Sequence, residues 1–222
     1  MTASGKRSRL PPEQRRAQLL ALGVDLLADR TLDELSIEDL AEAAGVSRGL
    51  LFHYFSGKAD FHLQVVRAAA DDLIERTAPD PAWPADEVLV RSVAAFVGYV
   101  ETNRRAYVAL VRGASSGDDA VRAVFESTRE RLAGRTVEVM EALGLVVDPT
   151  ARLAVRGWIA FVEDVTVSWC TAPDAPDKPS RGQLLDLLTR ALPGVVFGSA
   201  VDVIGVAAAA ARSDERVTAP GR

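Results

Sequence analysis

Side chains that commonly perform catalysis or bind metals are few in this sequence and lie far apart. The histidines are His53 and His62, and the single cysteine is Cys170. Nucleophilic catalysis requires a base beside the nucleophile, and a metal site requires several closely spaced ligands. The sequence has no HExxH, no paired CxxC, no phosphate-binding glycine loop and no dinucleotide fingerprint, and its carboxylates show no spacing that suggests a catalytic site. We therefore expect no enzyme, no metal site and no cofactor.

Basic side chains gather at the start of the sequence, where they are suited to contact phosphate. Residues 1–16 carry Lys6, Arg7, Arg9, Arg15 and Arg16 against the acid Glu13. The whole chain nevertheless has a net charge of −5, and its N-terminal acids concentrate between residues 29 and 42. If the chain binds nucleic acid, these acids must face away from phosphate, and binding should be strongly salt-dependent. A disordered, solubilising arm is the alternative for the basic segment.

The segment from Ser36 to Phe55 predicts two short helices that would position such contacts. Ser36 and Asp39 have the spacing of a capping box, Gly45 is suited to end the first helix, and Ser47 can cap the second. Two apolar stripes at helical spacing accompany these signals: Ile37, Leu40, Ala41 and Ala44, then Val46, Leu50, Leu51 and Phe55. Helices this short need a third to pack against. The pattern predicts a helix-turn-helix, whose second helix enters the DNA major groove; the alternative is an ordinary helical hairpin in an all-α core.

Helix-breaking residues divide the rest of the sequence into further helices. Pro11 and Pro12 begin the third helix that the hairpin needs, and Pro193-Gly194 should bend or end a late one. We expect helices over residues 15–29, 58–78, 86–102, 104–114, 118–143, 150–170, 183–192 and 199–212, a proline-rich linker at 79–84, a loop at 173–182 and a frayed end at 213–222. No alternating β pattern is present, so the predicted fold class is all-α.

The composition indicates a folded protein of the cytosol. Hydrophobic residues make up 48% of the 222 residues, which is ample for a packed core. One cysteine excludes an intrachain disulfide and favours a reducing compartment. No charged-then-apolar leader opens the sequence, and the longest apolar segment, 195–211, is interrupted by Asp202. We expect no membrane partner.

The ordered motif LSIEDLAEAAGVSRGLLFHYFSGKADF at 35–61, with the helix before it, resembles the TetR family of bacterial transcriptional repressors. The resemblance covers about the first quarter of the chain, and the remainder agrees in length and helicity. It implies a basic arm and DNA-binding domain at 1–57, a connecting helix at 58–78, and a helical effector-binding and dimerising domain at 79–222. It also places the protein in the bacterial cytosol, associated with the nucleoid.

The same resemblance assigns DNA contacts to the second helix of the hairpin and its surroundings. Arg48, Gly49 and His53 would face the groove, with Arg48 the candidate for a bidentate guanine contact. The positions expected to hold phosphates are Ser36, Ser47, Tyr54 and Lys58. Phe52 departs from the family, which commonly has a tyrosine there, so it packs on sugar or a thymine methyl or makes no contact. The basic arm adds Lys6, Arg7 and Arg9. A solvated His53 without a role is the alternative for that residue, and His62 is expected to be a bystander.

The larger domain has two strongly apolar helices and scattered aromatic residues. The helices at 150–170 and 183–192 have wide apolar faces, which suit burial or a four-helix homodimer interface, and the resemblance implies the same pair. Six aromatic residues that either line a pocket for a lipophilic ligand or form core are Phe96, Tyr99, Tyr107, Phe125, Trp158 and Phe161. Glu163 and Asp164 lie inside the most apolar helix, where a buried carboxylate is costly unless it is paired. One of the two could pair with a ligand amine or with an arginine such as Arg156; the alternative is that both form salt bridges at the surface.

Together these features predict a homodimeric DNA-binding regulator, a repressor that a small, lipophilic effector releases from a pseudo-palindromic operator. Two alternatives remain at this stage. One is a helical small-molecule-binding protein or enzyme whose N-terminal hairpin is structural. The other is a helical adaptor that binds protein, which would require an apolar patch on the second helix of the hairpin.

Overall fold

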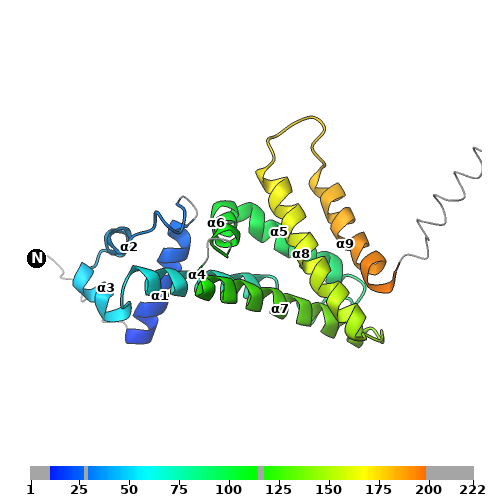
Figure 1. Cartoon of the computed structure of the whole chain (residues 1–222), viewed down its shortest axis with the longest axis horizontal. Helices are drawn as coiled ribbons and strands as arrows, with labels where there is room; N and C mark the ends of the chain where they lie inside the picture. Colours follow the sequence, from blue (N-terminus) through cyan, green and yellow to red (C-terminus); the bar gives the residue numbers. More distant parts are fainter. Residues whose placement is uncertain (1–10, 28–29, 115–117, 199–222) are drawn as a thin grey trace, which may run out of the picture.

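The computed structural model describes residues 11–27, 30–114 and 118–198. Within these residues the chain is all-α, and α1 and α4 through α9 accompany the helical hairpin (Figure 1). The helices are α1 (Pro12–Leu26), α2 (Ile37–Ala44), α3 (Arg48–Tyr54), α4 (Lys58–Arg76), α5 (Val88–Thr102), α6 (Arg104–Ala114), α7 (Asp119–Ala142), α8 (Pro149–Thr171) and α9 (Arg181–Phe197). The basic arm and the helix expected at 199–212 lie outside the described residues. No helix in the described part of the chain is long and apolar enough to cross a membrane.

The local signals between α1 and α4 operate as the sequence predicts. The Ser36 side chain accepts the backbone N–H of Asp39, and the Asp39 carboxylate accepts that of Ser36. Gly45 ends α2 in the left-handed region with φ 61°, and Ser47 accepts the N–H of Leu50 to begin α3. These contacts stop one helix and start the next within three residues, which fixes the hairpin.

The hairpin packs on α1 and on the first half of α4 to form one core. Its fully buried members come from all of these elements and include Leu19, Leu40, Leu51, Phe55 and Phe61. The ring centroids of Phe55 and Phe61 lie 5.1 Å apart. This core forms one end of the molecule (Figure 1). The short α2 and α3 are therefore held by tertiary packing rather than by their own stability.

Gly23→Ala should destabilise this core although alanine favours helices. A Cβ at Gly23 would lie 2.7 Å from Val65 Cγ2 on α4 and 3.4 Å from the Phe61 ring. A stiff valine cannot yield easily, so the overpacking cost, about 1–3 kcal/mol, exceeds the propensity gain, about 0.5–1 kcal/mol. We expect a lower melting temperature. The control is Gly134→Ala in α7, where a new Cβ meets nothing within 4 Å and stability should rise; equal shifts would contradict the clash.

The connecting helix α4 belongs to both halves of the molecule. Phe61 and Val65 lie in the N-terminal core, whereas Leu73 lies in the core of the larger domain. Between them, Val66 packs with Val121 and Phe125 of α7. A displacement of either end of α4 is therefore transmitted to the other through packed side chains.

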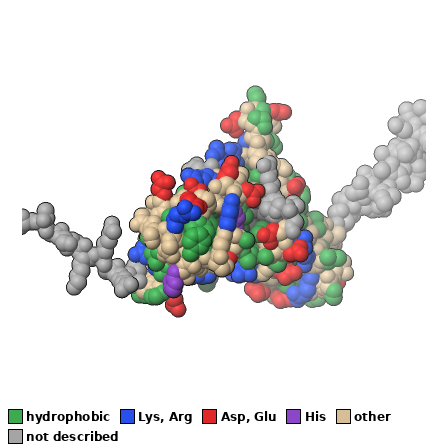
Figure 2. All heavy atoms as spheres, turned by 60° about the vertical axis from the view of Figure 1, so that its left-hand side comes forward, with side chains coloured by type: hydrophobic (Ala, Val, Ile, Leu, Met, Phe, Trp, Pro, Cys, Tyr) green, Lys and Arg blue, Asp and Glu red, His purple; other side chains and the backbone are tan. Residues whose placement is uncertain are grey.

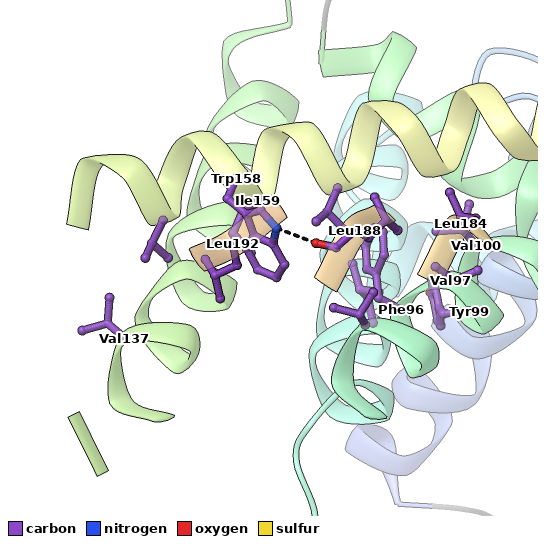
Figure 3. Packing of buried hydrophobic residues seen from close by; sticks show 14 of the residues in the cluster. Phe96, Val97, Tyr99, Val100, Val137, Trp158, Ile159, Leu184, Leu188 and Leu192 are labelled. Atoms are coloured by element: carbon purple, nitrogen blue, oxygen red, sulfur yellow. Dashed lines mark hydrogen bonds between the residues drawn. The ribbon is translucent and has the colours of Figure 1, made fainter. Parts of the chain in front are cut away.

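The larger domain consists of α5 through α9 around a second core. Trp158 of α8 donates its indole N–H to the Leu188 carbonyl of α9 at 2.9 Å, and Leu192 and Ile159 lie beside it (Figure 3). Pro193-Gly194 was expected to bend or end a late helix. It does not end α9, which continues to Phe197. Leu192 is buried and Val196 packs on the core, which holds the chain helical past the proline.

Candidate nucleic-acid interface and effector cavity

The α3 helix turns one face inward and presents the other to solvent. Leu51 is fully buried, whereas Arg48, Gly49, Phe52 and His53 are exposed. Phe52 is 53% exposed, which is high for a phenylalanine and leaves it available for apolar contact with a sugar or a thymine methyl. A Cβ at Gly49 would meet nothing within 4 Å, so another surface can approach the helix closely there. The exposed face is mixed in character and includes Arg48, as a base-contacting helix requires.

Charges beside α3 are paired within the module. Arg48 forms an ion pair with Glu38 of α2, and Arg30 pairs with Asp39. The hydrogen bonds from Arg30 and Ser36 lower the pKa of Asp39 to about 2. Figure 2 shows basic and acidic side chains interspersed over this end of the molecule. Glu38, one of the acids at 29–42 that were expected to face away from phosphate, is therefore paired with the main candidate for base contact.

The other predicted DNA-binding residues surround α3. Ser36 and Ser47 are the caps of α2 and α3, Tyr54 is half-buried with its ring 5.5 Å from that of His53, and Lys58 Nζ donates to the Asp33 carbonyl at 2.7 Å. His62 has a structural contact, since its Nε2 lies 2.7 Å from the Leu35 carbonyl oxygen. These residues lie in the hairpin or at the start of α4 directly after it. Their contact with DNA remains a prediction.

A cavity of about 210 Å³ lies inside the larger domain and is lined mainly by apolar side chains. Four of the six aromatic candidates line it, namely Phe96, Tyr107, Phe125 and Trp158. Tyr99 does not, because its hydroxyl is directed to α4 and donates to the Ala69 carbonyl at 3.2 Å. Phe161 is half-buried outside the lining. Leu73 of α4 and Thr77, the residue that follows this helix, also line the cavity, so a ligand there would touch the connecting helix.

One wall of the cavity holds a buried polar cluster. Glu163 is 4% exposed and accepts the Tyr107 hydroxyl at 2.6 Å and Arg129 Nε at 2.7 Å. Burial raises the pKa of Glu163, and the hydrogen bonds from Tyr107 and Arg129 oppose that rise. Burial also raises the pKa of Tyr107 well above its usual value, with a further contribution from Glu163. The cluster is therefore a satisfied ion pair and hydrogen bond rather than a vacant acceptor.

The ion-pair partner of Glu163 is Arg129 and not Arg156, which the sequence suggested. Arg156 instead pairs with Glu126 and Glu130 at the surface, and Asp164 is exposed. Arg129 lies 34 residues from Glu163 and on a different helix, so no local spacing points to this pair. Arg135, which also lines the cavity, was likewise not singled out. In the described part of the chain, no group of histidine, cysteine or acidic residues is arranged to hold a metal ion.

Comparisons with known proteins agree with this architecture at both ends of the chain. Residues 19–65 match the family model described as "Bacterial regulatory proteins, tetR family", and residues 85–192 match "Tetracyclin repressor-like, C-terminal domain". The chain belongs to the TetR family. Both TetR models describe regulators rather than enzymes, and the protein is accordingly a helix-turn-helix transcriptional regulator.

Individual TetR relatives support the assignment over different lengths. The transcriptional activator FasR of Mycolicibacterium smegmatis is 25% identical over 182 residues, which cover 80% of this chain and 83% of that protein. The repressor KstR2 of Rhodococcus jostii is 37% identical over 59 residues, covering 27% of this chain and 29% of KstR2. A TetR-family regulator of Streptomyces coelicolor shares the fold with a TM-score of 0.71 and 29% identity, over 84% of this chain and 82% of that one.

Proposed function

We propose that this TetR-family regulator is a homodimeric repressor that binds a pseudo-palindromic operator through α3 and is released by a small lipophilic effector. The observation that carries the proposal is the cavity, since its mainly apolar lining includes residues of α4, the same helix that packs into the DNA-binding module. We infer the domain division from the same features, with DNA binding at 1–57, connection at 58–78, and effector binding and dimerisation at 79–222.

The proposed coupling acts through α4. Its Leu73 lines the cavity together with Thr77 just past the helix end, while its Phe61 and Val65 are fully buried in the N-terminal core. An effector that binds one position of α4 better than another would change the separation of the two α3 helices in a dimer. A coupling free energy of about 1–3 kcal/mol would alter operator affinity roughly 5- to 150-fold.

The proposed dimer forms through α8 and α9, which pack against one another. Large apolar side chains on these helices remain uncovered in the single chain: Leu153 is 71% exposed and Leu187 is 52% exposed. Val195 and Phe197 at the end of α9 are also exposed. A two-fold interface would bury these groups and would present two α3 helices to the two half-sites of an operator.

Arg48→Ala should weaken operator binding by about 1–3 kcal/mol and relax the preference at one base pair in each half-site. The measurement is a titration of the operator and of single-base variants by fluorescence anisotropy. Arg122→Ala, which removes an exposed arginine of α7 paired with Asp119, is the matched control and should bind as the wild type does. An equal loss on all sequences would instead make Arg48 a phosphate contact.

Activation of transcription is a second candidate, because the relative that matches over most of its length is named an activator. Transcription in vitro from a promoter that carries the operator distinguishes the two. A repressor lowers the amount of transcript when the protein is added, and the effector restores it. A rise in transcript on adding the protein would overturn repression and would leave the DNA-binding assignment intact.

A further inference from the structure

The charges that line the cavity do not cancel. The charged lining residues are Arg129, Arg135 and Glu163. Arg129 and Glu163 neutralise one another through their ion pair. Arg135 is left as an excess positive charge in a lining that otherwise consists of apolar side chains and hydroxyl groups.

Arg135 has a backbone partner but no carboxylate partner. Its Nη1 donates to the Ile74 carbonyl at 2.6 Å, and among the described residues no carboxylate lies within ion-pair distance of it. The side chain is half-buried, and burial and the charge of Arg131 lower its pKa, while the charge of Glu138 opposes this shift without forming an ion pair. A guanidinium stays charged under these conditions. Because the charge of Arg135 is partly removed from water, an anionic group of a ligand bound in the cavity would stabilise it.

We propose that the effector is an amphipathic organic acid whose carboxylate binds Arg135 while its apolar part fills the cavity. This inference rests on the proposed effector function of the cavity and names the chemical class of the ligand. The planar guanidinium matches a carboxylate in geometry and can donate two parallel hydrogen bonds to it. The Glu163 carboxylate does not favour a cationic ligand, because both of its oxygens already accept hydrogen bonds from Tyr107 and Arg129.

Arg135 also connects the proposed carboxylate of the ligand to α4. Ile74 lies in the last turn of α4, and Thr77, the residue that follows the helix, lines the same cavity. Arg135 therefore holds the end of the connecting helix from α7. A carboxylate that engages this guanidinium acts directly on a contact between the cavity and the helix that reaches the DNA-binding module.

The test compares three probes with the same heptyl chain: octanoic acid, methyl octanoate and heptylamine. Binding to the full chain is measured at pH 7 by tryptophan fluorescence, since Trp158 lines the cavity. We expect the acid to bind about tenfold or more tightly than the ester, and the amine to bind most weakly. Arg135→Gln retains a donor for the Ile74 carbonyl but removes the charge, and it should abolish the preference for the acid while leaving ester binding within about twofold.

Two controls keep the outcomes distinct. Arg131→Gln changes an exposed arginine one turn earlier on α7, which pairs with Asp71 and does not line the cavity, so it should retain the preference for the acid. Ester binding by Arg135→Gln confirms that this variant is folded. Equal binding of acid and ester by the wild type, or tighter binding of the amine, would overturn the organic-acid inference alone. Binding of none of the three would overturn the lipophilic effector itself.

Discussion

Arg129→Met should lower the free energy of unfolding by about 3–5 kcal/mol at pH 7, because it leaves the buried Glu163 carboxylate without its ion-pair partner. Methionine replaces the arginine stem with an apolar chain of similar length, although it also removes the guanidinium that lies 4.3 Å from the centroid of the Phe125 ring. The loss is therefore attributed to the unpaired charge and not to a cavity. Urea unfolding followed by circular dichroism measures it.

The loss of stability in Arg129→Met should also depend on pH, because it arises from the ionised form of Glu163. Arg129 lowers the pKa of Glu163, so its removal leaves burial to raise that pKa further above the value in the unfolded chain. A carboxyl group with a raised folded pKa costs stability while it is ionised, and this cost disappears as the pH falls through the folded pKa. The difference between Arg129→Met and the wild type should therefore shrink as the pH is lowered from 7.

Matched variants separate the buried pair from an ordinary surface pair. Arg156→Met removes an arginine whose partners, Glu126 and Glu130, are exposed, and it should cost less than about 1 kcal/mol. Adding Glu163→Gln to Arg129→Met removes the stranded charge and should recover a large part of the loss. If the two arginine variants were equally stable, the buried charge would not be the source of the effect.

Leu187→Arg should convert the dimer to a monomer and weaken operator binding by about a hundredfold or more. Leu187 is exposed on α9 in the single chain, so the substitution leaves the fold intact but places a charge in the proposed interface. A monomer engages one half-site at a time and loses the effective concentration that links two binding modules. Sedimentation velocity measures the assembly, and fluorescence anisotropy measures the affinity for the operator.

The control for the dimer prediction is Val146→Arg. Val146 is 88% exposed in the connection between α7 and α8, and the substitution adds the same charge outside the proposed interface. It should leave both assembly and operator binding unchanged. A Leu187→Arg protein that remained dimeric and bound DNA as the wild type does would exclude this part of α9 from the interface.

Features that depend on neighbours in the sequence were predictable, and those that depend on distant residues were not. The capping box of Ser36 and Asp39 and the left-handed Gly45 follow from side chains within three or four residues. The partner of Glu163 is 34 residues away on another helix, and Arg135 contacts a carbonyl 61 residues away. No pattern of spacing within one helix identifies such partners, because they depend on how α7 packs against α8 and α4.

Pro193 and Glu38 illustrate two ways in which local rules are overridden. A proline inside a helix usually breaks it, but the buried Leu192 and the packed Val196 hold α9 helical to Phe197. The acids before α3 seemed incompatible with phosphate and were expected to face away, yet Glu38 pairs with Arg48. In both cases tertiary contacts decide the outcome.

Recognition of a symmetric DNA sequence by the α3 helices of two copies of this chain is the core of the proposed function. Its most direct test is selection of genomic fragments by the purified full-length protein, followed by sequencing of the bound DNA. We expect enriched fragments to share a motif with internal two-fold symmetry and half-sites about one helical turn apart, and we expect Arg48→Ala to recover a motif that has lost its preference at one base pair in each half-site. Recovery of fragments with no shared symmetric motif, or the same motif recovered by Arg48→Ala, would contradict it.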